Sequence, residues 1–501
     1  MAASRVRKPV TAAMKYFLRL TEEQHLQLRV HLFPGDGKEA VALLLCGRQK
    51  SESRHTFIVR KVVPIPHAAC SVRSPDRITW PTDLVDSLVD ESYGIENAII
   101  KVHSHCEDYR RFSRTDDDSD RQLFSSVAAL LDDGLPHASV IMLQSGELFG
   151  RVLNEVGEPV ASFDAITSIG SDLRIWEPLR DNKVGAFAQR TGQAFGSGTI
   201  ARLGRISAAV VGCSGTGSVV IEQLARLGVG RLVLIDPDVV EEKNLNRILN
   251  STREDANEKR AKVHVLADAI RRMGVVQEVV PLQENLASSE AIRAVADCDV
   301  IFGCVDSVEG RHILNRIATF YVLPYFDIGV RLDADGKGGI AGIVGAVHYI
   351  QPGRSSLLSR GVYSLKEVEA EEMKRINPSL YELQRKQGYL RGVNEGRPAV
   401  ISVNMFFAAL AVNDFLARIH PYRNQPNSDF ASIPCNLAEM TLLPEPEGPI
   451  ARCSSGTSAE ETALLFWREL RLHEKIHLTV AERGAFNILP NVFGAVRFGT
   501  P

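Results

Sequence analysis

Paired cysteines, long apolar runs and a large net charge are all missing from this sequence of 501 residues. None of the 8 cysteines stands in a C-x-x-C pair, so we expect reduced thiols and no disulfide framework. No apolar run approaches the ~20 residues that span a bilayer, and the basic N-terminus lacks the apolar core of a signal peptide. The net charge of −3 argues against binding to nucleic acid or to a membrane surface. A cytoplasmic protein is therefore expected.

The apolar content, by contrast, is sufficient for several cores. Hydrophobic residues make up 45% of the chain and aromatic residues 7%, as is ordinary for globular proteins, and the length predicts two or three domains. We expect a domain over 1–160, a linker over 161–200, a domain over 201–423 and an extension over 424–501. The sequence does not indicate a role for that extension.

The most informative stretch runs from 206 to 247. An apolar run at 208–211 predicts a buried strand, a glycine-rich turn and a helical pattern follow, and a second apolar run at 232–235 ends in Asp236. The turn has its glycines at Gly212, Gly215 and Gly217. Backbone N–H groups at such a helix start can face a phosphate, and an acid at the end of the second strand can hold ribose hydroxyls. This unit predicts a nucleotide site, but Ser214 stands where the dinucleotide fingerprint has its middle glycine, and a dehydrogenase is an equal alternative at this point.

The residues after the second strand favour one family. Asp236-Pro-Asp238 continues through Val-Val-Glu-Glu-Lys to Asn244-Leu-Asn-Arg247, which resembles the DxDxVxxxNLxR signature of the ThiF/MoeB/E1 superfamily. Lys262 lies where that family has a phosphate-binding lysine, and the segment 306–311 resembles its DNxxxR motif. These enzymes adenylate the C-terminal glycine of ubiquitin-like proteins.

The resemblance implies a role for each of these residues. The glycine turn, with Asp238 and Asn244, would bind ATP; Asp236 would hold the ribose; Arg247 and Lys262 would neutralise charge on the phosphates; and Asp306 would hold Mg²⁺. An arginine ahead of the first strand often reaches an ATP phosphate across a homodimer in this family, and Arg190 resembles it, although a surface arginine is an equal alternative. Residues 352–397 would be the family's crossover loop and 398–418 its core helix.

The crossover loop departs from the family in one respect. Many relatives carry a thioester-forming cysteine or two CxxC pairs there, whereas this sequence has no cysteine between 304 and 435. A structural zinc in this half is therefore not expected. Cys435 and Cys453 are the remaining thioester candidates, and both are weak.

A second set of motifs lies near the N-terminus. His103 and His105 end a predicted strand at 97–102, so both imidazoles lie on one face, and Asp116 follows near a predicted helix start. Two imidazoles and a carboxylate leave one position open in a tetrahedral zinc site. Glu39 would accept a proton from water that zinc activates, and Ser113 would donate a hydrogen bond to the tetrahedral oxyanion. The constellation is similar to the JAB/MPN (JAMM) metallopeptidases, which cleave peptide or isopeptide bonds after ubiquitin-like C-termini. The alternative is a pair of surface histidines beside acidic residues.

Around these motifs the pattern predicts strands at 28–33, 40–45, 57–63, 138–143 and 147–152. The fold class implied is α/β: an N-terminal JAB/MPN metallopeptidase fold and a C-terminal Rossmann-like ThiF/E1 adenylation domain. The expected partners are a ubiquitin-like protein with a C-terminal glycine and an E2-like protein. Three alternatives stay open: a sulfur-carrier pathway in which the JAB domain releases a small product, a catalytically silent scaffold, and an NAD-dependent oxidoreductase.

Overall fold

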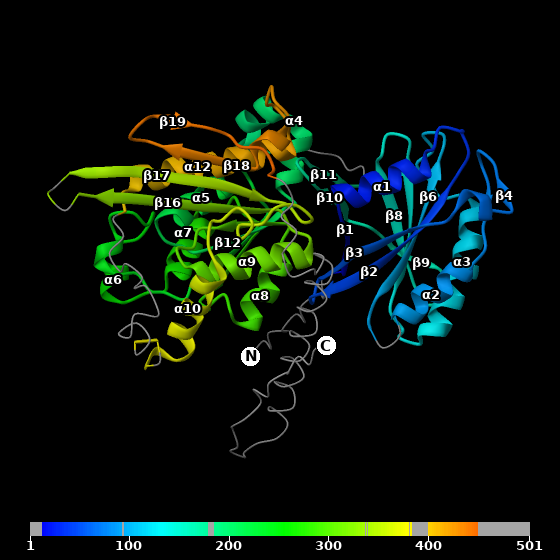
Figure 1. Ribbon diagram of the computed structural model, residues 1–501, viewed down its shortest axis with the longest axis horizontal. Helices are drawn as coiled ribbons and strands as arrows, with labels where there is room; N and C mark the ends of the chain where they lie inside the picture. Colours follow the sequence, from blue (N-terminus) through cyan, green and yellow to red (C-terminus); the bar gives the residue numbers. More distant parts are fainter. Residues whose placement is uncertain are drawn as a thin grey trace, which may run out of the picture. The chain divides into compact units, whose positions relative to one another are not determined.

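The structure is a computed structural model, and it describes residues 13–92, 95–178, 185–335, 337, 339–379, 381–382 and 399–448. Two large sheets dominate these residues, one from each half of the chain, and a two-stranded sheet joins β4 (Val72–Arg73) to β5 (Ile78–Thr79). Figure 1 shows the elements coloured along the sequence.

The N-terminal half forms a nine-stranded mixed sheet in the order β11-β10-β1-β3-β2-β6-β7-β8-β9. Its central strands are nearly continuous apolar runs, which is why they are buried on both faces. The strands are β1 (Lys15–Thr21), β2 (Val41–Lys50), β3 (Arg54–Pro64), β6 (Ala98–His105), β7 (His137–Leu143), β8 (Leu148–Leu153), β9 (Pro159–Ser162), β10 (Ala165–Ile169) and β11 (Leu173–Trp176).

Helices cover both faces of this sheet. Helix α1 (Glu22–Leu32) packs on one face through Leu28 and Leu32. Helices α2 (Asp83–Ser92) and α3 (Arg114–Leu131) pack on the other. Strand β6 alternates between the two, so that Val102 faces α1 and Ile99 faces α2 and α3. By that alternation His103 and His105 lie on the α3 side.

The strand expected at 28–33 is wrong, because α1 occupies these residues. Thr21 begins the helix with a capping box: its hydroxyl accepts from the backbone N–H of Gln24, whose side chain accepts from Thr21 N–H. The alternation of Leu28, Val30 and Leu32 suggests a strand, but Val30 is 66% exposed. The buried positions His25, Leu28 and Leu32 follow helical spacing instead.

The sheet also continues past residue 160, into the segment expected to be a linker. Strand β10 pairs in parallel with β1, and β11 pairs antiparallel with β10. The apolar positions Ile166 and Ile169 of this short strand are buried. Helix α4 (Gln189–Leu203), preceded by the short η2 (Ala186–Ala188), follows and bends at Gly196, where φ is 80°.

The C-terminal half forms an eight-stranded sheet in the order β14-β13-β12-β15-β16-β17-β18-β19. The first five strands in that order run parallel, and β17, β18 and β19 add antiparallel. Strands β13 and β15 lie on opposite sides of β12, so the chain reverses its direction of winding there, which is where doubly wound sheets bind nucleotides. The strands are β12 (Ser207–Val211), β13 (Arg231–Ile235), β14 (Glu278–Leu282), β15 (Val300–Gly303), β16 (Tyr325–Ala334), β17 (Ile340–Ile350), β18 (Ser432–Asn436) and β19 (Thr441–Leu442).

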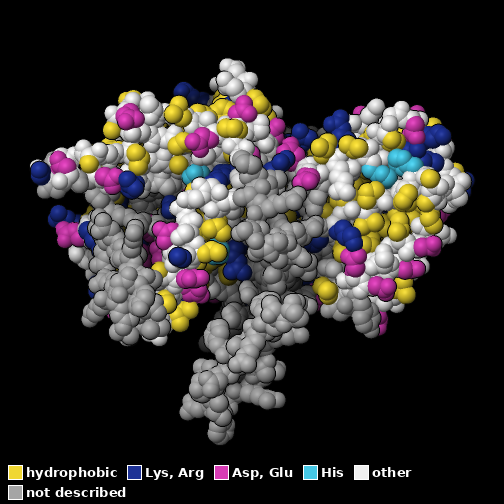
Figure 2. All heavy atoms as spheres, in the orientation of Figure 1, with side chains coloured by type: hydrophobic (Ala, Val, Ile, Leu, Met, Phe, Trp, Pro, Cys, Tyr) yellow, Lys and Arg dark blue, Asp and Glu magenta, His cyan; other side chains and the backbone are white. Residues whose placement is uncertain are grey.

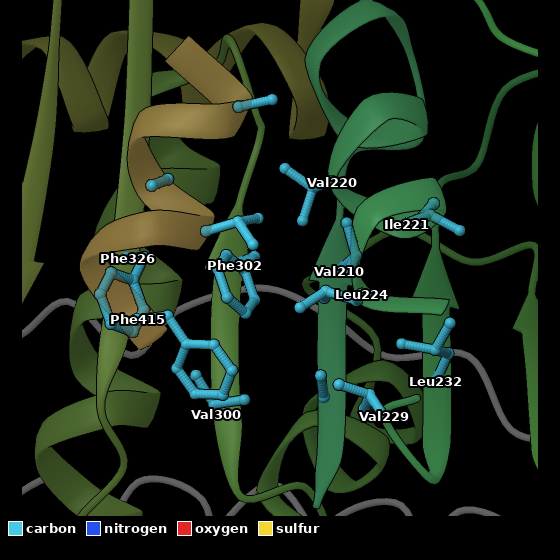
Figure 3. Packing of buried hydrophobic residues seen from close by; sticks show 14 of the residues in the cluster. Val210, Val220, Ile221, Leu224, Val229, Leu232, Val300, Phe302, Phe326 and Phe415 are labelled. Atoms are coloured by element: carbon cyan, nitrogen blue, oxygen red, sulfur yellow. The ribbon is translucent and has the colours of Figure 1, made fainter. Parts of the chain in front are cut away.

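Helices cover both faces of this sheet as well. One face packs against α5 (Gly215–Arg226), α7 (Lys262–Met273) and α12 (Ile401–Ile419), the other against α8 (Ser289–Ala296) and α9 (Val308–Tyr321). Figure 3 shows the first of these cores, where Phe302 of β15 and Phe326 of β16 meet Phe415 of α12. The other helical segments are η1 (His67–Ala69), η3 (Glu242–Asn244), α6 (Arg253–Asn257), α10 (Leu365–Ile376) and η4 (Asn427–Phe430).

Helix α12 (Ile401–Ile419) confirms the helix expected at 398–418 from 401 onward; residues 399 and 400 precede it. By length and composition alone it could cross a membrane, but 61% of its apolar window is buried inside the protein, as befits a core helix.

On the face shown in Figure 2, acidic and basic side chains are interspersed, with no large patch of one sign.

Candidate functional site

The two histidines and the aspartate of the N-terminal half meet in space. Strand β6 presents His103 and His105, and the first turn of α3 presents Asp116. One ligand atom from each of the three lies within 4.8 Å of the others, which is the spacing of donors around one ion. Among the described residues this is the group whose side chains are arranged in that way.

The ring nitrogens of both histidines are placed so that they could bind a metal ion. Both ring nitrogens of His103 are buried without a hydrogen-bond partner among the described residues; Nε2 lies 3.0 Å from Oδ1 of Asp116 but without hydrogen-bond alignment. Burial lowers the pKa of His103, and the neighbouring Asp116 opposes that fall; the neutral imidazole that burial favours is the form that binds metal. Nδ1 of His105 lies 2.8 Å from the carbonyl oxygen of Tyr109, a contact that fixes the proton on Nδ1 and leaves Nε2 free to ligate. These donors fit zinc.

Asp116 is held in place by the start of its own helix. Its Oδ2 accepts hydrogen bonds of 2.7 Å from both the backbone N–H and the hydroxyl of Ser113, which is the N-cap of α3. Burial raises the pKa of Asp116, but the neighbouring His103 and the bonds from Ser113 outweigh it and hold the pKa well below its usual range. The carboxylate is therefore ionised and oriented. In this structure the hydroxyl of Ser113 orients the carboxylate of Asp116. Its expected hydrogen bond to an oxyanion stays a prediction.

Glu39 reaches the same face from β2. Val41 pairs with His103 across the β2–β6 ladder, and Glu39, two residues before Val41, continues that face toward His105. Burial, and then the charge of Asp116, raise the pKa of Glu39 to about 8. Its backbone is fixed by hydrogen bonds to Ser74 and from the Arg73 side chain. A carboxylate with a pKa near neutrality beside a metal cluster can act as a general base and then as a general acid.

In the C-terminal half the expected glycine turn lies at the ends of parallel strands. Gly212 follows β12 with φ of 88°, and a Cβ there would lie 2.5 Å from the carbonyl oxygen of Cys304. A Cβ at Gly217 would lie 1.8 Å from the carbonyl oxygen of Gly212, and one at Gly215 would lie 2.2 Å from Nδ2 of Asn404. The backbone contacts require glycine at 212 and 217, whereas at Gly215 the contact is with the end of a side chain. Ser214, which departs from the family pattern, has φ of −100°, so a side chain there is unstrained.

The acid after β13 is tied to this turn. Asp236 accepts hydrogen bonds from the backbone N–H of Cys213 at 2.7 Å and of Asp238 at 2.9 Å. Lys262, at the start of α7, places Nζ 2.7 Å from Asp238 and 3.6 Å from Asp236. Burial raises the pKa of Asp236, and the charge of Lys262 opposes that rise. The structure thus brings the predicted ribose-binding acid and the predicted phosphate-binding lysine together.

Of the remaining predicted nucleotide ligands, Arg247, Asn244 and Asp306 follow the ends of β13 and β15, whereas Arg190 does not. Arg247 approaches the turn, since its Cδ would lie 3.1 Å from a Cβ on Gly215. Asn244 is buried, and its side chain accepts from Glu241 N–H. Asp306 is exposed after β15 and acts electrostatically on Arg311 of α9. Arg190 lies exposed on α4, and nothing in the described residues joins it to this group.

Comparison with protein-family models decides the family of this half. The model of the ThiF family matches residues 188–447, which is more than half of the chain. The chain belongs to the ThiF family. A second model, for prokaryotic homologs of the JAB domain, matches residues 21–149, so this ThiF-family chain is a fusion with an N-terminal JAB domain.

Named relatives match only part of this ThiF-family chain. It is 39% identical over 115 residues to the adenylyltransferase and sulfurtransferase MOCS3 of Sus scrofa, covering 23% of this chain and 25% of that protein. It is 33% identical over 115 residues to the SAMP-activating enzyme E1 of Haloferax volcanii, covering 23% and 42%. The chain thus spans about a quarter of the length of the first relatives. A crystal structure of E. coli MccB with ATP covers 55% of this chain and 76% of its own, at 18% identity and a TM-score of 0.40.

Two residues of these sites carry no sequence signal. Asn404 of α12 contacts the glycine turn, where Thr216 donates a 3.4 Å hydrogen bond to it, although it lies outside the motifs of the ThiF family named above. Tyr109 acts through its backbone carbonyl, which any residue could supply.

Cys435 is buried in β18, and burial raises the pKa of its thiol, which disfavours a thioester role. Cys453 lies outside the described residues.

Proposed function

We propose that this chain is a bifunctional enzyme of a ubiquitin-like pathway. The ThiF-family half adenylates the C-terminal glycine of a ubiquitin-like protein, using ATP and Mg²⁺, and the JAB half cleaves peptide or isopeptide bonds after that C-terminus, using zinc. The observation that carries the proposal is that one chain has both a glycine turn joined to Asp236 and Lys262 and a cluster of three metal ligands beside Glu39.

In the adenylation step the glycine carboxylate attacks the α-phosphorus of ATP, and the bond to pyrophosphate breaks. The chain's contribution is positioning and charge neutralisation. The backbone N–H groups of the turn receive phosphate oxygens, Asp236 holds the ribose, and Arg247 and Lys262 neutralise the phosphates. Lys262 then exchanges its contact with Asp238 for one with phosphate. Asp306 would hold Mg²⁺, which offsets charge on the departing pyrophosphate.

In the cleavage step His103, His105 and Asp116 would hold a zinc ion, which when bound would supply a water of lowered pKa and polarise the scissile carbonyl. Glu39 accepts the proton of the attacking water and returns it to the departing amine. Ser113 keeps Asp116 oriented and would turn its hydroxyl toward the developing oxyanion. Burial favours the neutral, ligating form of His103, and a proton fixed on Nδ1 of His105 by the carbonyl oxygen of Tyr109 leaves its Nε2 able to ligate.

The proposed partners are a ubiquitin-like protein with a C-terminal glycine and an E2-like protein that receives it. A homodimer through the ThiF-family half, with Arg190 reaching the partner's nucleotide, is part of the proposal. Cytoplasmic localisation follows from reduced thiols and ATP dependence.

The test uses zinc-loaded, full-length protein and a ubiquitin-like protein with a C-terminal glycine. Pyrophosphate exchange into ATP should depend on that protein and should disappear in Asp306→Asn but not in Glu369→Gln, a change of an exposed acid on α10. Cleavage of a linear fusion after the terminal glycine should disappear in Glu39→Gln, with zinc content kept, but not in Glu23→Gln on α1.

Each alternative predicts a different result. Thiocarboxylate formation in place of an isopeptide product would indicate the sulfur-carrier pathway. Binding without either reaction would indicate a scaffold, and protection against thermal unfolding by NAD but not by ATP would indicate an oxidoreductase.

A further inference from the structure

A cavity of about 430 Å³ opens beside the metal-ligand cluster of the JAB domain. The segment before α3 and the β8–β9 hairpin form its walls. The segment contributes Arg110, Arg111 and Phe112, β8 contributes Phe149, Gly150 and Arg151, and all four residues of β9 line the cavity. The ring of Phe112, which lines the cavity, also approaches the cluster: its centroid is 6.4 Å from that of His103 and 5.9 Å from that of Phe149. The cavity therefore adjoins the proposed cleavage site through Phe112.

Three arginines in the lining make the cavity basic, but their charges are not equally available. Arg151 lies over Phe112 at 3.9 Å and pairs with Asp117 and Asp120 of α3. Arg110 pairs with Glu147 and Asp108. Both charges are thus largely neutralised by their own surroundings.

Arg111 differs from the other two. It is exposed, and it makes no hydrogen bond or ion pair with any residue that the structure describes. A guanidinium offers five donors in a planar fork that matches a carboxylate. The cavity therefore holds one positive charge without a counter-charge, and a carboxylate is its complement.

Strand β9 gives the cavity an edge along which a chain can lie. It is the outermost strand of the nine-stranded sheet on that side, and it pairs with β8 alone among the described strands. Pro159, Val160 and Ser162 are exposed. An extended peptide can add to such an edge through backbone hydrogen bonds, with alternate side chains entering neighbouring pockets.

We propose that this cavity is a specificity site for an acidic side chain of the polypeptide that the JAB domain cleaves. The peptide lies extended along β9, and its Asp or Glu pairs with Arg111. That acid lies near the scissile bond in the sequence, because Phe112, the residue next to Arg111, has its ring centroid 6.4 Å from that of His103. The inference rests on the proposed peptidase function, and it names the feature by which that site selects its substrate.

The experiment measures binding and cleavage separately. The probes are fluorescein-labelled peptides of ten residues with a central Gly-Gly and a single Glu or Gln placed at each position within four residues of it. Binding is measured by anisotropy with zinc-loaded, full-length Glu39→Gln protein, which should hold peptide without cleaving it, and kcat/KM with the zinc-loaded parent.

The parent should favour Glu over Gln at one position by about two- to fivefold, as an ion pair with an exposed arginine predicts. Arg111→Gln should abolish that preference in binding and in kcat/KM, and Arg111→Glu should transfer it to a Lys-containing peptide. The control is Arg114→Gln, an exposed arginine at the first residue of α3 outside the cavity lining, which should keep the preference. Both positions are exposed, so neither change threatens folding.

The possible outcomes distinguish failure of the acid-binding site from failure of the proposed peptidase function. Equal binding of Glu and Gln peptides at every position, or a preference that survives Arg111→Gln, overturns the specificity site, whether or not peptides are cleaved. A preference that depends on Arg111, together with no cleavage of any peptide or fusion, supports the acid-binding site and refutes the peptidase function.

Discussion

Replacing Lys262 by methionine should destabilise the ThiF-family half in a pH-dependent manner. Lys262 and Asp236 are both buried, at 6% and 5% exposure, with Nζ 3.6 Å from Oδ1. Methionine keeps an unbranched side chain as far as Cε and removes the charged ammonium group. Asp236 then remains buried with two backbone N–H donors but without a cation.

The magnitude follows from two opposing terms. At an effective dielectric constant of about 20, two charges 3.6 Å apart attract by about 4–5 kcal/mol. Part of that is offset because the variant no longer has to desolvate an ammonium group. The contact with Asp238, whose side chain is 65% exposed, contributes ~0–1 kcal/mol because solvent screens it. We expect a net loss of about 2–3 kcal/mol at pH 7.5.

The pH dependence gives the sharper test. Burial already raises the pKa of Asp236, and the charge of Lys262 opposes the rise, so the pKa rises further in the variant. A carboxyl whose pKa is higher in the folded protein than in the unfolded chain loses stability as the pH rises and regains it on protonation. The difference between parent and variant should therefore shrink by about 1 kcal/mol or more between pH 7.5 and pH 5.5.

The assay is urea unfolding of nucleotide-free, full-length protein followed by far-UV circular dichroism at both pH values. Lys243→Met is the matched control, because the side chain of Lys243 is 76% exposed and, among the residues that the structure describes, forms an ion pair with the half-exposed Glu241 alone; its effect should stay below about 0.5 kcal/mol. A Lys262→Met loss below about 1 kcal/mol, or one that is equal at both pH values, would refute the reasoning.

Three further predictions concern separate parts of the chain. Arg247→Ala should slow partner-dependent pyrophosphate exchange ~10²–10³-fold through lost charge neutralisation while fusion cleavage is unchanged; equal loss of both activities would indicate misfolding instead. Burial lowers the pKa of His137 to about 3, so the parent should lose stability as pH falls from about 6.5 toward 3, and His137→Gln should lose about 1–2 kcal/mol less than the parent between pH 7 and pH 5 in the same urea assay; parallel curves would contradict this. Cys435→Ala should leave any reductant-sensitive adduct with the ubiquitin-like protein intact on a non-reducing gel, because burial raises the pKa of that thiol; loss of the adduct would identify it as the nucleophile, whereas loss in Cys453→Ala would identify the other.

Much of both sites could be predicted because their signals are local. The glycine turn, the acid after β13 and the helix beginning at Lys262 follow one another along the chain, and each is fixed by short-range backbone geometry. The two histidines likewise lie two residues apart on one strand. Their meeting with Asp116 needed only the short connection from β6 to α3.

The rest could not be predicted, for physical reasons that differ from place to place. At 28–33 a period of two and a helical period fit the same apolar residues, and the capping box at Thr21 decides between them. Strand β10 is too short to stand out before its pairing with β1 is known. Asn404 reaches the glycine turn from a helix distant in sequence, and Tyr109 contributes a carbonyl oxygen that no side-chain pattern reveals.

The glycine turn also limits how the proposed nucleotide site could evolve or be engineered. Backbone carbonyl oxygens leave no space for a methyl group at Gly212 and Gly217, whereas at Gly215 the end of the Asn404 side chain is what would have to move. Ser214, with a negative φ and partial exposure, can carry a side chain. A library built for altered nucleotide use should hold Gly212 and Gly217 constant and randomise 214 and 247.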